Sequence, residues 1–203
     1  MQFIDISSGL LGSEVYPGDP EPRLHLVDRM DCGDEFNLSA IYSSLHTGTH
    51  ADAPAHVFDE ADAVTIDQIP LEKFIGPVEI ITLPEGPVTG EMVEKIFPKK
   101  AKKVILRTHE SSEFFAGAAK DVAALGYDLI GYDKLSMGGK NEIEMHRDIL
   151  GAGTVILEGL NLTHVKEDGE YFLMAQPIKI EGREAAFVRA VLISDSVIWS
   201  AKW

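Results

Sequence analysis

Residues 46–56 read HTGTHADAPAH, so three of the chain's seven histidines and one aspartate fall within one short segment. A helix would bring His46 and His50 to one face, but a glycine, a proline and two β-branched threonines oppose a helix here. In an extended strand, every second side chain lies on the same face. We therefore expect the three histidines and Asp52 to line one side of a strand.

This residue set is typical of a metal site. Imidazole and carboxylate ligands together suit zinc, manganese or iron(II). Pro54 would end strand pairing and turn the chain, which would swing His56 away from the other ligands and over an open coordination position. The alternative is a polar surface strand, which three histidines and an aspartate on one face disfavour. The local spacing leaves open whether one ion or two are bound.

Two side chains from later in the sequence are further candidate ligands. In the expected helix over 142–150, His146 shares a face with apolar residues and so points toward the core, as a ligand or as a core histidine. The apolar run 154–157 ends in Glu158. Burial of a carboxylate costs several kcal/mol unless the group is paired or coordinated, so we expect Glu158 to be a ligand from a second segment.

Short apolar runs rich in β-branched residues alternate with helical patterns through the middle of the chain. The pattern predicts a mixed α/β (α+β) fold with a single domain over residues 1–203. Expected strands cover residues 3–6, 23–27, 36–43, 78–83, 104–108, 129–132, 154–158 and 190–193. Expected helices cover residues 91–97, 113–125 and 142–150.

Charge and hydropathy exclude several classes of partner. The formal net charge of −15 argues against nucleic acid and anionic membranes, which would need a basic surface. No apolar run approaches the roughly 20 residues that span a bilayer. The single cysteine, Cys32, offers no disulfide framework and is compatible with a cytoplasmic protein. These features are compatible with a small-molecule substrate as the partner.

The segment 46–56 resembles the cyclase-like metal-dependent hydrolases, a family that includes bacterial kynurenine formamidases and isatin hydrolases. It matches their signature His-x-Gly-Thr-His-x-Asp-x-Pro-x-His at every specified position. The resemblance extends to the turn at 17–19, the segment 131–136, the helix with His146 and the segment 158–162. It implies a compact domain of mixed sheets with flanking helices, of the swivelling β/β/α type, and a homo-oligomer, either a dimer or a tetramer.

The resemblance also implies roles for the candidate residues. His56 resembles the catalytic histidine beside the metals. The expected ligands of a first metal are His46, His50 and Asp52, and those of a second metal are Asp52, His146 and Glu158. The expected cofactor is a divalent metal, Zn²⁺ or Mn²⁺, with one or two ions per chain.

The activity that the resemblance implies is arylformamidase-like hydrolysis of a small amide, a formamide such as N-formylkynurenine, or a cyclic amide. Tyr16 precedes the turn at 17–19 where kynurenine formamidases tend to have tryptophan, and the segment 137–141 also differs from theirs. Two alternatives remain open from the residues. One is a metal-dependent cyclase or dehydratase acting on a carbonyl compound. The other is a non-catalytic, metal-stabilised binding protein.

Overall fold

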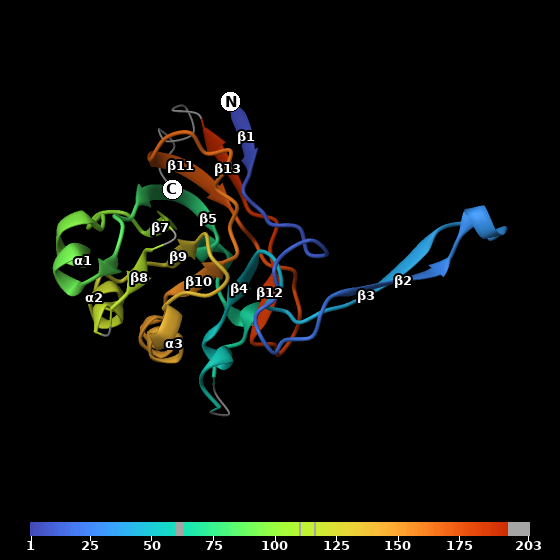
Figure 1. Cartoon of the computed structure of the whole chain (residues 1–203), viewed down its shortest axis with the longest axis horizontal. Coiled ribbons are helices and arrows are strands. Elements are labelled where there is room, and N and C mark those ends of the chain that lie inside the picture. The colour runs from blue at the N-terminus through green and yellow to red at the C-terminus, as the bar shows by residue number, and fades with distance from the viewer. Residues whose placement is uncertain (60–62, 110, 116, 195–203) are drawn as a thin grey trace.

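The computed structural model describes residues 1–59, 63–109, 111–115 and 117–194 (Figure 1). A nine-stranded mixed sheet forms its centre, with strand order β1-β13-β11-β5-β7-β9-β10-β4-β12. Its strands are β1 (Gln2–Asp5), β4 (His50–Asp52), β5 (Ile75–Thr82), β7 (Lys103–Arg107), β9 (Leu129–Tyr132), β10 (Val155–Glu158), β11 (Gly169–Met174), β12 (Ala185–Phe187) and β13 (Val191–Ser194). The mixed α/β fold class predicted from the sequence is confirmed.

The middle of this sheet is parallel and buried on both faces. Strands β5, β7, β9 and β10 pair in parallel, and β4 then pairs antiparallel with both β10 and β12. Every residue of β9 and β10 is buried, which agrees with their nearly continuous apolar sequence. Such strands hold the polar side chains at their ends in fixed positions.

Three helices cover one face of the sheet (Figure 1). They are α1 (Gly90–Ile96), α2 (Ala118–Ala124) and α3 (Glu142–Gly151). Val93 of α1, Val122 of α2 and Ile149 of α3 share one buried cluster with Leu106 and Ile156 of the sheet. A second cluster fills the opposite face and includes Phe74, Ile80 and Leu129. None of the helices in the described ranges is long and apolar enough to cross a membrane.

Strands β2 (Arg23–Asp28) and β3 (Leu38–Tyr42) form an arm that projects from the rest of the chain (Figure 1). They pair only with each other within the described residues. Every residue of the two strands except Asp28 is exposed. The smaller elements are β6 (Pro87–Val88), β8 (Glu113–Phe114) and the 3-10 helices η1 (Met30–Cys32), η2 (Pro54–His56), η3 (Ile66–Gln68), η4 (Leu71–Lys73) and η5 (Gly139–Asn141).

The helix expected over 113–125 is wrong in its first part, because α2 begins at Ala118. Glu113 and Phe114 instead pair in parallel with Pro87 and Val88. This pairing overrides the local helical pattern, because the partner strand lies 26 residues earlier in the chain and gives no local signal. Strands β11 and β12 were not predicted at all.

The extended strand expected from His46 to Pro54 is also wrong in its first part, whereas the turn expected at Pro54 is present. Only His50–Asp52 forms a strand. The chain bends before it, where Gly48 adopts a left-handed φ of 67°, and Pro54–His56 forms a 3-10 helix after it. The common face therefore comes from a turn, a short strand and a helical turn rather than from strand alternation.

Gly159 permits the close approach of β10 to this bend. Its φ is 66°, and a Cβ there would lie 2.9 Å from the carbonyl carbon of Gly48. Gly182 has nearly the same φ of 68° but open space around it.

We predict that Gly182→Ala lowers the melting temperature by a few degrees, since the left-handed backbone alone costs about 1–2 kcal/mol. Gly159→Ala should lower the melting temperature by at least twice as much, because the new methyl group would also displace the backbone of Gly48.

Thermal unfolding of the two variants, read by circular dichroism, tests this difference. Equal shifts for the two alanines would show that the contact between Gly159 and Gly48 is not tight.

Candidate metal centre

Four elements and one turn bring the six predicted site residues together. His50 and Asp52 lie on β4, and Glu158 ends β10. The antiparallel register places His50 directly opposite Glu158, so their side chains lie on one face. The other contributors are His46 from the bend, His56 from η2 and His146 from α3.

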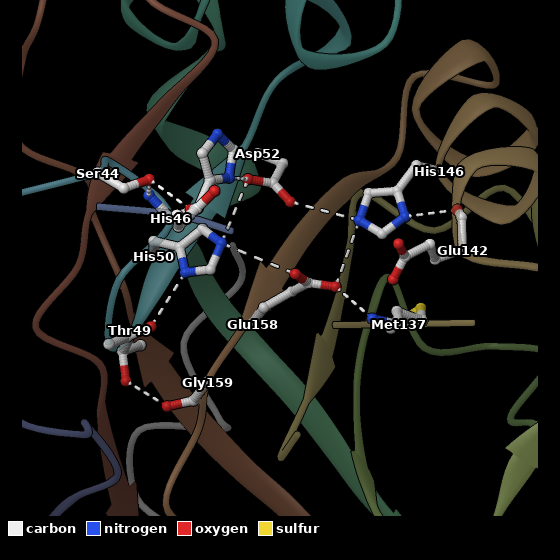
Figure 2. A network of polar contacts seen from close by, with 12 residues as sticks. Ser44, His46, Thr49, His50, Asp52, Met137, Glu142, His146, Glu158 and Gly159 are labelled. Carbon is white, nitrogen blue, oxygen red and sulfur yellow. Dashed lines mark hydrogen bonds and ion pairs between the residues drawn. The ribbon is translucent and has the colours of Figure 1, made fainter. Parts of the chain in front are cut away.

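Asp52 is the centre of this group (Figure 2). Its Oδ1 lies 3.0 Å from His46 Nδ1 and 3.5 Å from His50 Nε2. Its Oδ2 lies 3.7 Å from His146 Nε2. Glu158 completes the ring, with Oε2 at 3.7 Å from His50 Nε2 and Oε1 at 3.4 Å from His146 Nε2. Two carboxylates thus alternate with imidazoles around one small space.

His56 lies beside the same group. Its ring centroid is 4.2 Å from that of His46 and 5.6 Å from that of His146. One ligand atom each from His46, Asp52 and His56 lies within 4.8 Å of the others, and so does one each from His50, Asp52 and Glu158. Asp52 belongs to both sets, as a bridging carboxylate would. The division into ligands and a catalytic histidine that the resemblance implies stays a prediction.

The site holds buried polar atoms that have ion-pair contacts but no hydrogen bond. Asp52 is completely buried, and neither of its carboxylate oxygens has a hydrogen bond of acceptable geometry among the described residues. The Nε2 atom of His50 is also buried and also lacks a hydrogen bond among these residues. Leaving such groups unsatisfied costs about 1–3 kcal/mol each, and more when they are charged. A divalent cation bound to these donors would offset that cost, so the residues present fit a metal.

Backbone contacts orient two of the imidazoles toward the centre. His50 Nδ1 lies 3.0 Å from the carbonyl oxygen of Gly48, and His146 Nδ1 lies 2.7 Å from that of Glu142 (Figure 2). When Nδ1 of each neutral imidazole donates to its carbonyl oxygen, Nε2 keeps a lone pair that faces the carboxylates. Glu158 Oε1 accepts a hydrogen bond of 2.6 Å from the Met137 amide, which fixes that carboxylate.

Burial and charge act in opposite directions on these groups in the protein without a cation. Burial lowers the pKa of His146, but the neighbouring carboxylates of Asp52 and Glu158 outweigh it and raise that pKa to about 11. Burial raises the pKa of Asp52, but the surrounding histidines hold it well below its usual value. Burial dominates at His56 and lowers its pKa. His56 therefore tends toward the neutral imidazole, which can accept a proton.

A cavity of about 180 Å³ opens onto these residues. Tyr16 forms part of its wall and donates a short hydrogen bond to the Glu142 carboxylate. Asp19 lies at the same cavity and accepts a hydrogen bond of 2.8 Å from Ser44 Oγ. Sequence reasoning singled out Tyr16 but missed Asp19, Glu142 and Glu184, whose Oε1 lies 3.8 Å from His46 Nε2. Glu142 had one signal, since it lies one helical turn before His146.

Several polar residues at strand ends have structural partners instead. Arg107 donates to the carbonyl oxygens of Leu162 and Val165 and pairs with Asp168. Asp133 accepts hydrogen bonds from the amide and hydroxyl of Thr108. Neither belongs to the metal-ligand groups found among the described residues, and the same holds for His25, His109, His164 and the exposed Cys32.

Comparisons with known proteins agree with this geometry. A family model described as a putative cyclase matches residues 4–134. The kynurenine formamidase of Salinibacter ruber is 33% identical over 95% of this chain and 97% of its own length. A solved structure described as a potential metal-dependent hydrolase with cyclase activity has a TM-score of 0.80 at 27% identity, over 94% of this chain and 96% of that chain. Isatin hydrolase A from Labrenzia aggregata shares the fold, with a TM-score of 0.78 at 20% identity over 94% of this chain and 93% of its own. The chain therefore belongs to the putative cyclase family, together with kynurenine formamidases.

Proposed function

We propose that this protein is a metal-dependent hydrolase that cleaves a small amide, a formamide such as N-formylkynurenine, or a cyclic amide. The observation that carries the proposal is the buried Asp52 carboxylate, which lies among histidines and Glu158 without a hydrogen bond. The kinship with kynurenine formamidases supports a carbon–nitrogen bond other than a peptide bond as the target. A non-catalytic binding protein would have no need of a proton-accepting histidine beside the donors.

We assign the metal to the donors of His46, His50, Asp52, His146 and Glu158, with Zn²⁺ or Mn²⁺ as the expected ion and room for one or two. When bound, a divalent cation supplies Lewis acidity toward a carbonyl oxygen and acidifies water. Met137 and the carbonyls of Gly48 and Glu142 hold the donors in place. We expect these contacts to set the geometry before substrate arrives.

His56 has the position and the pKa for proton transfer. Its ring packs against that of His46, and its lowered pKa keeps the imidazole neutral near pH 7. A neutral imidazole accepts a proton from attacking water and then returns it to the departing nitrogen. Tyr16 and the apolar side chain of Ile143 line the cavity and offer a surface for a planar substrate.

We predict that His56→Ala keeps the metal but lowers kcat by about 10²–10⁴-fold, because a general acid–base group is lost. Asp52→Ala should lose the metal, because the carboxylate shared by both donor groups is gone. Elemental analysis of the purified variants, together with the rate assay, separates these outcomes. His164→Ala, at an exposed histidine, serves as the control. Loss of metal in His56→Ala would make His56 a ligand instead.

The substrate prediction uses the protein loaded with zinc or manganese. We expect chelator-sensitive hydrolysis of at least one of N-formylkynurenine, isatin and simple cyclic amides or imides. In water enriched in heavy oxygen, the label should appear in the product acid. Turnover without incorporated label would favour the cyclase or dehydratase alternative. Unfolding that responds to chelator, with no turnover of any compound, would favour the binding protein.

We further propose a homo-oligomer formed through the arm of β2 and β3. An isolated two-stranded sheet is marginal in water, yet this one exposes large apolar side chains. Leu24 pairs across the strands with Ile41, and strand alternation places Leu26 on the same face. An identical arm on a second copy offers the matching apolar surface.

Light scattering after size-exclusion chromatography tests the arm. The wild type should exceed the 22.2 kDa of one chain, as a dimer or tetramer, and the double variant Leu24→Ser/Ile41→Ser should shift to that monomer mass. His25→Ser, on the opposite face of β2, is the control and should leave the mass unchanged. A monomeric wild type would overturn the proposal.

A further inference from the structure

A second and larger cavity lies away from the metal centre. Its volume is about 700 Å³, and its walls include Ile75, Pro77 and Val78 of β5. Lys103, the first residue of β7, also lines it. The cavity thus opens at the amino ends of β5 and β7, whereas Glu158 lies at the carboxyl end of the parallel strand β10. The two cavities share no lining residue.

Lys103 places a positively charged group in the wall of this cavity. Its exposed fraction is 5%, and it is the one lysine or arginine classed as buried in the described part of the chain. Its Nζ lies 3.3 Å from the position that a Cβ on Gly76 would take, and Gly76 itself lines the cavity. Its Nζ is not among the enclosed side-chain atoms that lack a hydrogen bond in the described residues, so the ammonium end of this buried side chain faces the cavity.

Because most of the Lys103 side chain is buried, its ammonium group is only partly solvated. Burial lowers the pKa of Lys103, and the charge of Asp128 opposes that shift without forming an ion pair. The methylene stem of a lysine packs well against apolar walls, but that packing alone does not require an ammonium at its end. A ligand with a negative charge would pair with this group and offset its desolvation.

The remaining charges limit what kind of anion fits. Glu79 and Glu170 face each other across β5 and β11 and both line the cavity, where burial and their mutual repulsion raise the pKa of Glu79. Glu72 adds a further carboxylate to the lining. Asp128, Lys100 and Lys102 also line the cavity, so its four carboxylates outnumber its three ammonium groups, and this excess disfavours a multiply charged anion such as phosphate. The cavity tolerates a ligand whose one negative charge reaches Lys103 and whose remainder is apolar.

We propose that this cavity is a binding site for a small apolar monocarboxylate. The carboxylate pairs with the Lys103 ammonium, and the apolar body contacts Ile75, Pro77 and Val78. The site is independent of the metal centre and of the hydrolase activity proposed above.

The test uses the metal-loaded protein and 3-phenylpropionate as the probe, with binding read from backbone amide NMR shifts. We expect saturable shifts at Gly76, Ala101 and Lys103. Lys103→Met should weaken binding at least tenfold, because it keeps the packing and removes the charge. Lys100→Met is the matched control, since Lys100 lines the same cavity but is exposed, and it should change the affinity less than twofold.

The neutral analogue 3-phenylpropionamide separates charge recognition from simple apolar binding and needs no variant. It should bind the wild type at least tenfold more weakly than the acid. Equal binding of the two compounds, or equal binding to wild type and Lys103→Met, would overturn the proposal. So would shifts confined to Gly159 and Met137, because they would place the carboxylate at the metal centre. Saturating shifts at Gly76 with inorganic phosphate would contradict the preference for a monoanion.

Discussion

The burial of the Asp52 carboxylate is the constraint on which the rest of this structure depends. Its two oxygens are completely enclosed, so the fold must surround them with groups that favour a negative charge. Imidazoles from the preceding bend, from β4 and from α3 do so, and they hold its pKa well below the usual value. The same arrangement leaves the Asp52 oxygens and His50 Nε2 without a hydrogen bond, and a bound cation would satisfy them. Stability of the closed site and affinity for a metal are thus linked.

The register of two strands and the close approach of two glycines bring these side chains together. The antiparallel pairing of β4 with β10 places His50 opposite Glu158, and a shift of one residue would turn one of them to the other face. Gly48 and Gly159 both adopt left-handed backbone and pass within contact of each other. Thr49 reinforces this crossing, because its hydroxyl donates to the Gly159 carbonyl oxygen at 2.7 Å and accepts from the Ser8 amide (Figure 2).

The candidate metal-ligand residues were predictable from the sequence because several of them are close together in it. Their arrangement in space was not predictable. Three histidines and an aspartate in one segment indicate a metal, and Glu158 after a buried run indicates a second contributor. The extended shape expected for 46–49 was wrong, because the chain bends at Gly48, which contacts Gly159, 111 residues later. Glu184 was missed for the same reason, since only the pairing of β12 with β4 brings it near His46. Long-range pairing of this kind leaves little trace in local periodicity.

The charges around the smaller cavity bear on which substrates it admits. Asp19 and Glu142 line it, and Glu184 lies against His46. A bound cation offsets the inner carboxylates Asp52 and Glu158 but leaves the outer ones in place. Free carboxylates on a substrate are repelled near Asp19 and Glu142, whereas a neutral amide or an ammonium group is not. The hydrogen bond from Tyr16 to Glu142 keeps that carboxylate at the wall rather than over the histidines. Neutral carbonyl compounds, and zwitterions whose ammonium group lies near these carboxylates, therefore match the site better than net anions do.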